Sequence, residues 1–250
     1  MAWIEAHFRA MVLVKMTSLY VLLPDGPGPF PVLYLLHGLS DDHSGWLRRT
    51  GLERHMDNVP MIVAMPDAHR SFYVNNPAPG GSPYEDHIIK DVIGFVDTTF
   101  RTIPQRGARA VAGMSMGGYG AMMLGFKHAD LFSVACSHSG AVGAFHHPRP
   151  EVPLLQDLSS AIDISQYDCF ALAQKQKERP AGELAIRIDC GDKDFLLQDN
   201  RDFHAHLEQL GIAHSYAEFP GDHNWAYWDV HIQDTIRFIR QKLPALQGQE

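Results

Sequence analysis

The stretch RAVAGMSMGGYGAMMLGFKH (109–128) decides the fold of this chain. Its first seven residues have the apolar character of a buried strand, and residues 117–128 have the pattern of a helix. Between them, Gly113-Met114-Ser115-Met116-Gly117 predicts a sharp strand-to-helix turn with Ser115 at its apex. Side chains two residues before and after the serine would collide, so glycine is favoured at both positions. The turn would place the Ser115 hydroxyl above the sheet at a helix N-terminus, where negative charge is stabilised.

Strand and helix patterns alternate on both sides of this turn. We expect helices at 84–99, 199–210 and 225–243, and strands at 3–9, 18–23, 31–38, 61–66, 132–139, 184–191 and 214–221. This alternation predicts a doubly wound α/β fold, in which a mostly parallel sheet has helices on both faces. The two N-terminal strands are expected at an antiparallel edge. The chain is interpreted as one domain, 1–250, in which the proline-containing segment 141–182 is a cap-like insertion over the carboxyl ends of the strands.

Composition excludes several classes of function. The 250 residues carry a formal net charge of −8 and no run of four basic residues, which disfavours nucleic acid and anionic membranes as partners. No stretch approaches the roughly 20 apolar residues of a membrane helix, and the N-terminus lacks the pattern of a signal peptide. The three cysteines are widely spaced and fit no zinc motif, as expected for reduced thiols. We therefore expect a cytoplasmic protein.

A second motif, Leu36-His37-Gly38-Leu39, ends an early strand and predicts an oxyanion hole. Acyl transfer needs two hydrogen-bond donors directed at the developing oxyanion. One donor is expected from the residue after the nucleophile, the Met116 N–H, and the other from the loop after an early central strand, here the Leu39 N–H.

The base and the acid are predicted from chain order, which runs serine, acid, histidine in hydrolases with this kind of turn. Of the 15 histidines, His223 is the one that follows the last expected strand and precedes a helix. The acid should follow the preceding strand, where Asp194 stands just before an apolar pair that can anchor its loop. Asp192 remains the alternative, because a shift of two residues keeps the same side of an extended loop.

Three further residues are candidates for contact with substrate. Trp46 follows the predicted oxyanion loop and fits either an acyl-binding wall or a core aromatic. Tyr73 and Asn75 lie beyond a strand end near the expected cleft, although an ordinary polar loop explains them as well. The acidic cluster Asp41-Asp42-His43 has no distant partners, so we expect no metal.

Taken together, these motifs resemble the putative-esterase branch of the α/β-hydrolases. That branch includes tributyrin-type esterases, S-formylglutathione hydrolases, feruloyl and acetylxylan esterases and the antigen 85 mycolyltransferases. The matching stretches are LYLLHGLSDDHSGWLRRTGLER (33–54), MPDAHRSFYVN (65–75), GMSMGGYGAM (113–122), CGDKDFLLQDNRDFH (190–204) and FPGDHNWAYWD (219–229). The greatest similarity is to the small tributyrin or acetyl esterases.

The resemblance implies the α/β-hydrolase fold, a triad of Ser115, Asp194 and His223, and oxyanion donors at Leu39 and Met116. It also implies hydrolysis of short-chain acyl esters, including acetylated sugars, through an acyl-enzyme and without a cofactor. The alternatives are a feruloyl or acetylxylan esterase, an S-formylglutathione hydrolase, or an inactive binding module with the same fold. Ser40-Asp41-Asp42 stands where the formylglutathione enzymes typically have a cysteine-containing loop. A small ester is the expected partner, and a homo-oligomer is left open.

Overall fold

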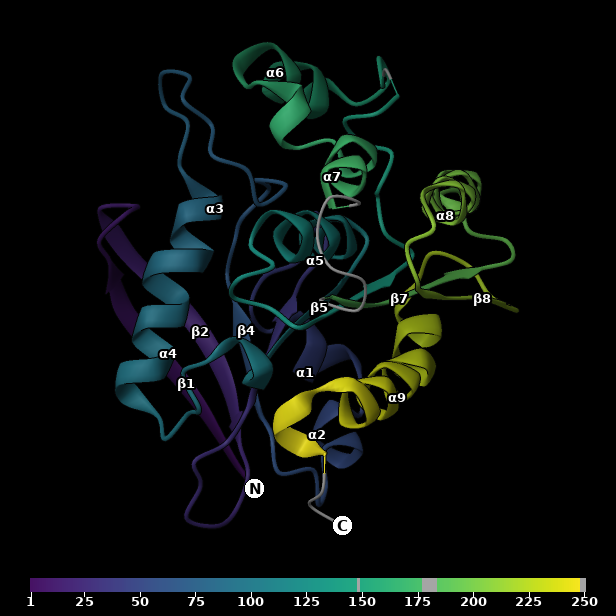
Figure 1. Ribbon diagram of the computed structural model, residues 1–250. Helices are drawn as coiled ribbons and strands as arrows, with labels where there is room; N and C mark the ends of the chain where they lie inside the picture. The colour runs from purple at the N-terminus through teal and green to yellow at the C-terminus, as the bar shows by residue number, and fades with distance from the viewer. Residues whose placement is uncertain (148, 177–183, 248–250) are drawn as a thin grey trace.

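The computed structural model describes residues 1–147, 149–176 and 184–247. Its centre is an eight-stranded sheet of order β1-β2-β4-β3-β5-β6-β7-β8 (Figure 1). The strands are β1 (Ala2–Ala10), β2 (Lys15–Leu23), β3 (Val32–Leu36), β4 (Ile62–Pro66), β5 (Arg109–Met114), β6 (Val134–His138), β7 (Ala185–Gly191) and β8 (Ser215–Phe219). The pairs β1–β2 and β2–β4 are antiparallel, and the remaining pairs are parallel.

Helices connect the parallel strands, and the longest of these are α5 (Met116–Lys127) and α8 (Leu197–Leu210). The last long helix, α9 (Trp225–Lys242), follows β8. The helix expected at 84–99 is formed by α3 (Tyr84–Asp86), the π-helical η1 (His87–Val92) and α4 (Ile93–Thr99). Short elements that the sequence patterns did not predict are α1 (Gly45–Arg49), α2 (Leu52–His55), η2 (Arg106–Ala108) and η4 (Pro244–Leu246).

Each face of the sheet has its own apolar core. Within β3, Val32, Tyr34 and Leu36 face one core, whereas Leu33 and Leu35 face the other. This alternation follows from the two-residue period of a strand. Because helices cover both faces of the sheet, every residue of β3 is apolar. Figure 1 shows α5, α7 and α8 on one side of the sheet and α1, α2 and α9 on the other. The predicted mostly parallel, doubly covered sheet with an antiparallel N-terminal edge is therefore confirmed.

The segment 141–182 contains α6 (Pro153–Ala161), η3 (Ile164–Gln166) and α7 (Cys169–Gln176), while residues 148 and 177–182 lie outside the described part of the chain. Tyr167 attaches this segment to the core. Its carbonyl accepts a hydrogen bond of 2.7 Å from the hydroxyl of Tyr119 on α5, and its own hydroxyl donates to buried Glu85 at 2.9 Å. None of the helices in the described residues has the length and apolar character needed to cross a membrane.

Candidate active site

Ser115 occupies a strained turn between β5 and α5. Its backbone has φ 55° and ψ −118°, a conformation that costs free energy for any residue with a side chain and is held by the surrounding structure. A Cβ atom on Gly113 would lie 2.4 Å from the carbonyl oxygen of Gly117, and one on Gly117 would lie 2.5 Å from that of Leu36. Glycine is therefore required at both positions. The turn raises the Ser115 hydroxyl at the carboxyl ends of the strands.

The structure brings Ser115, His223 and Asp194 into one hydrogen-bonded chain. The Oγ of Ser115 lies 2.9 Å from Nε2 of His223, and Nδ1 of His223 lies 2.8 Å from Oδ2 of Asp194. The Asp194 carboxylate is buried and can only accept, so Nδ1 carries the proton and Nε2 is free to accept one from the serine. This arrangement can activate a hydroxyl as a nucleophile.

Asp192 and Asp194 have different surroundings, although both lie in the loop after β7. Asp194 accepts the Leu196 N–H at 2.8 Å through Oδ1, in addition to its contact with His223. Asp192 is exposed and accepts the N–H of Gly221 at 3.0 Å, which joins its loop to the one that carries His223. The structure therefore places Asp194, and not Asp192, against the imidazole.

The loop after β3 lies directly against Ser115. A Cβ atom on Gly38 would be 3.6 Å from Cβ of Ser115 and 2.7 Å from the Met114 sulfur, so only glycine allows this approach. Within the described residues the Leu39 N–H has no hydrogen-bond partner. Met116 is the first residue of α5, where a backbone N–H has no acceptor within the helix. Both predicted oxyanion donors therefore flank Ser115 with N–H groups available to a ligand.

Buried His37 holds this loop in place. Its Nε2 accepts the N–H of Ala68 at 2.9 Å, so Nδ1 carries the proton and donates to the carbonyl of Gly38 at 2.7 Å. Burial alone would raise the pKa of the neighbouring Asp67, but nearby donors and positive charge, among them the His69 N–H at 3.2 Å, lower it. The network fixes the backbone of Gly38 beside Ser115, next to the predicted donor Leu39.

Tyr73 and Trp46, two of the candidates for substrate contact, are both fully buried. The Tyr73 hydroxyl donates to the carbonyl of His37 at 2.9 Å, and burial raises the pKa of Tyr73 well above its ordinary value, so the hydroxyl stays protonated. The Trp46 indole N–H donates to the carbonyl of Leu36 at 3.0 Å. Both side chains therefore support the backbone at the end of β3 and are closed off from solvent.

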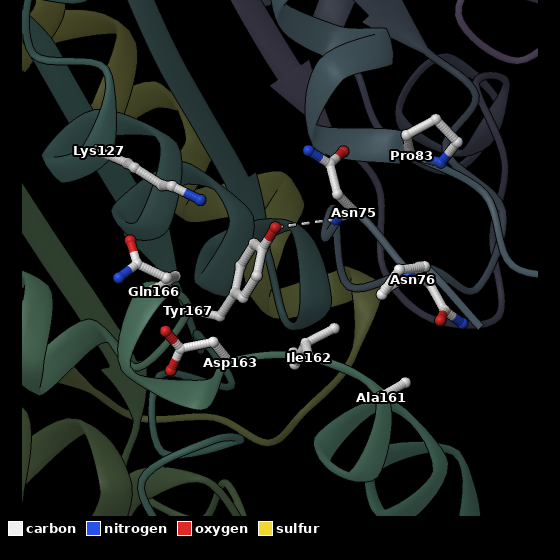
Figure 2. Close-up of a pocket in the computed structure, with 10 residues that line it drawn as sticks. Asn75, Asn76, Pro83, Lys127, Ala161, Ile162, Asp163, Gln166 and Tyr167 are labelled. Atoms are coloured by element: carbon white, nitrogen blue, oxygen red, sulfur yellow. Dashed lines mark hydrogen bonds between the residues drawn. The ribbon is translucent and has the colours of Figure 1, made fainter.

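Asn75, the third candidate, lines a different cavity. Its side-chain amide exchanges two hydrogen bonds with Asp86, at 3.1 and 3.0 Å, and its backbone N–H donates to the Tyr167 hydroxyl at 3.3 Å. The cavity has a volume of about 430 Å³ and lies between the loop 75–83 and the segment 161–167 (Figure 2). Lys127, at the opposite end of α5 from Ser115, also lines it. None of the three triad candidates does.

A buried charged cluster beneath Ser115 and His223 was not anticipated from the sequence. Asp189 of β7 accepts hydrogen bonds from His138, Arg187 and the Tyr227 hydroxyl, the last at 2.8 Å. The carbonyl of His138 holds the N–H of Ser115 at 3.0 Å, and the Tyr227 ring lies against Gly221, two residues before His223. No local motif reveals this cluster, because its members come from β6, β7 and α9. It connects the turn at Ser115 with the loop that carries His223.

The Asp189 cluster predicts acid-sensitive stability. Burial alone would raise the pKa of Asp189, but His138 and Arg187 lower it from 3.8 to about 2. Because the pKa of Asp189 is lower in the folded state than in the unfolded state, its ionised carboxylate stabilises the fold above pH 3.8 by roughly 2 kcal/mol. This contribution disappears as the pH falls towards 2 and the carboxylate is protonated in both states. In urea unfolding, the free energy of unfolding of the wild type should exceed that of Asp189→Asn, and this difference should decrease below pH 4. The exposed control Asp57→Asn should show no such trend, and a constant Asp189→Asn difference would contradict the prediction.

In the described part of the chain, no group of three or more His, Cys, Asp or Glu side chains is placed to hold a metal ion. Asp42 instead accepts hydrogen bonds from the backbone and hydroxyl of Ser44, at 2.8 and 2.5 Å.

Comparisons with known proteins place this chain among esterases. The family model described as "Putative esterase" matches residues 12–239. An acetyl esterase of Caldicellulosiruptor saccharolyticus is 26% identical over 96% of this chain and 98% of its own length. The crystal structure of an S-formylglutathione hydrolase from Staphylococcus aureus has a TM-score of 0.84 at 27% identity, covering 95% of this chain and 98% of that one. A ferulic acid esterase structure has a TM-score of 0.85 at 26% identity, covering 97% and 98%.

Proposed function

We propose, from the premise that this chain belongs to the putative esterase family of α/β-hydrolases and hydrolyses carboxylic esters, that Ser115, His223 and Asp194 are its catalytic triad. The single observation that carries the proposal is the hydrogen-bonded chain from Ser115 Oγ through His223 to Asp194, at 2.9 and 2.8 Å. It stands on a strained turn beside two available backbone N–H groups. These are the parts that acyl transfer to a serine requires.

In the proposed reaction, Ser115 Oγ attacks the ester carbonyl while His223 Nε2 takes its proton. The N–H groups of Leu39 and Met116 stabilise the oxyanion of the tetrahedral intermediate. His223 then donates its proton to the leaving alcohol, and the acyl group remains on Ser115. Water repeats the cycle with His223 as the base, which releases the acid and restores the serine. Asp194 keeps the imidazole oriented and stabilises its positive charge.

We propose short-chain acyl esters, including acetylated sugars, as the substrates. The similarity to an acetyl esterase over nearly the whole of both chains supports this choice. We also propose that the segment 141–182 forms a cap beside the cleft, because the Ala141 N–H donates to the Ser115 carbonyl at 3.0 Å. A series of p-nitrophenyl esters of increasing acyl length tests the substrate proposal. The highest kcat/KM is expected for the acetyl or butyryl ester, and activity confined to long chains would overturn it.

Two related activities compete with this proposal. The structural similarity to an S-formylglutathione hydrolase favours a thioester substrate, and the similarity to a ferulic acid esterase favours a feruloyl ester. Kinetics with S-formylglutathione, methyl ferulate and p-nitrophenyl acetate separate the three. A kcat/KM for either of the first two that exceeds the value for p-nitrophenyl acetate by a factor of about 100 would assign the function to that class.

An inactive binding module with the same fold is tested by covalent labelling. A fluorophosphonate probe should add to Ser115 in the wild type, as located by peptide mass spectrometry, because the probe needs an activated serine. Ser115→Ala should not be labelled. The cytoplasm remains our proposed compartment, and the three free, buried cysteines Cys136, Cys169 and Cys190 support it.

Tyr73→Phe tests the role of the loop after β3. Loss of the hydroxyl leaves the buried carbonyl of His37 without this partner, which should cost about 1 kcal/mol of stability. It should also lower kcat for p-nitrophenyl acetate about tenfold, because the oxyanion donors are less firmly placed, while KM changes little. Tyr216→Phe, in β8, is the control. An unchanged kcat in a destabilised Tyr73→Phe variant would restrict Tyr73 to a structural role.

A further inference from the structure

Phe195 is a large apolar side chain that remains exposed beside the proposed catalytic base. Its side chain is 76% exposed, and its ring centroid lies 4.5 Å from that of His223, with the planes inclined at 50°. Single exposed apolar residues are common on protein surfaces. Phe195, however, directly follows Asp194 in the chain, and its ring packs against the imidazole of His223. Its position is therefore fixed by the two residues of the proposed triad that it adjoins.

The backbone presents Phe195 in a fixed position. The Leu197 N–H donates to the carbonyl of Asp194 at 3.0 Å, which closes a turn with Phe195 near its apex. The Leu196 N–H donates to the Asp194 carboxylate at 2.8 Å. Asp194 and Leu196 are buried on either side of Phe195. The turn therefore directs the phenyl ring away from the core, towards the mouth of the site.

The imidazole is held from its inner side by Trp228. The two rings are perpendicular with centroids 5.0 Å apart, and the buried indole donates its N–H to Ser139 Oγ at 3.2 Å. His223 therefore does not depend on Phe195 alone for its orientation. The part of the Phe195 ring that faces solvent is available to a ligand.

The reaction itself determines which part of the substrate reaches this ring. Of the two proposed oxyanion donors, Met116 directly follows Ser115, and Leu39 follows β3 on one side of it. His223 and Phe195 follow β8 and β7, on the other side. Because the base protonates the leaving oxygen, that oxygen must come within hydrogen-bond distance of His223 Nε2. The group attached to this oxygen then extends past the imidazole, where Phe195 stands. The acyl group lies away from it.

We propose that Phe195 is the binding surface for the alcohol part of the ester, and that it selects alcohols that present a ring face, either the planar face of a benzyl group or the C–H face of a pyranosyl group. The proposal rests on the proposed esterase function and adds the substrate class on the leaving-group side. Offset-stacked or edge contacts between rings contribute enough free energy to change affinity about threefold to tenfold. The same surface should bind a ring-bearing alcohol that attacks the acyl-enzyme in the reverse direction.

The test compares two esters with the same acyl group, benzyl acetate and ethyl acetate. In Phe195→Ala, kcat/KM for benzyl acetate should fall about threefold to tenfold more than kcat/KM for ethyl acetate. Val230→Ala removes an apolar side chain that is 56% exposed on α9, and it should leave the ratio of the two values as in the wild type. Equal losses on both esters in Phe195→Ala would mean that the ring only shields His223, and would overturn the proposal.

A partition experiment gives an independent readout. The acetyl-enzyme formed from p-nitrophenyl acetate is offered benzyl alcohol or ethanol as the acceptor. His223 takes the proton of the attacking alcohol, the new ester forms, and Ser115 Oγ recovers the proton. Phe195→Ala should lose benzyl acetate formation selectively, and an unchanged benzyl-to-ethyl product ratio would contradict the proposal. A wild-type protein that hydrolyses no ester would overturn the esterase function as well. If the wild type is active and Phe195→Ala has the same benzyl-to-ethyl ratios as the wild type, only the proposed role of Phe195 is overturned.

Discussion

Ser115→Ala should lower kcat for p-nitrophenyl acetate by a factor of about 10⁴ or more, because it removes the atom that becomes acylated. The residual rate would come from direct attack of water on the ester carbonyl, with the N–H groups of Leu39 and Met116 stabilising the oxyanion. Alanine is smaller than serine and meets the same backbone requirement at φ 55°, so the fold should be retained. Steady-state kinetics and a burst experiment for acyl-enzyme formation measure the effect.

Ser160→Ala is the matched control for this variant. Ser160 is exposed on α6, and its hydroxyl donates to the carbonyl of Asp157 at 2.8 Å, within the same helix. Its removal should leave kcat and KM at wild-type values. If Ser115→Ala kept more than one hundredth of the wild-type kcat and still showed a burst, another residue would have to be the nucleophile.

Asp194→Asn should have the next largest effect, a loss of about 10⁴ in kcat with little change in KM. An amide at this position can donate a hydrogen bond to Nδ1 of His223, which favours the tautomer with its proton on Nε2. That tautomer cannot accept the proton of Ser115. The variant keeps the size of the side chain, so the loop after β7 should keep its shape. Kinetics on p-nitrophenyl acetate between pH 6 and 10 measure the loss.

Asp192→Asn provides the comparison that separates the two candidate acids. Asp192 lies two residues away and accepts only the Gly221 N–H from the neighbouring loop, at 3.0 Å, through a contact that the asparagine oxygen can replace. We expect kcat to fall less than tenfold. A loss in Asp192→Asn that equals or exceeds the loss in Asp194→Asn would reverse the assignment of the acid.

The strands and the nucleophile turn were predictable because they depend on local chemistry. A strand buried on both faces must be apolar throughout, as 109–114 is, and a turn at φ 55° excludes side chains at Gly113 and Gly117. Chain order then limited the base to a loop after the last strand. The two aspartates could not be separated in this way, because their positions differ by one strand period and only the contacts of the folded loops distinguish them.

The sequence did not predict whether the candidates for substrate contact face the substrate or the core. Tyr73 and Trp46 follow strand ends near the cleft, but both turn inward and donate to backbone carbonyls at the end of β3. Amphipathic aromatic side chains fit either environment, since each has an apolar body and one polar atom. The short helices α1 and α2 also lack a periodic pattern long enough to detect.

Sequence patterns alone predicted the α/β alternation, the turn that holds Ser115, and the position of His223 in chain order. Sterics or periodicity within about ten residues impose the first two, and the order of the strands along the chain gives the third. Only the tertiary structure decided that Asp194 contacts the imidazole, that Asp189 joins three elements beneath the site, and that Phe195 stays exposed at its mouth. These facts depend on which surfaces meet when distant segments fold together, and no local pattern specifies that.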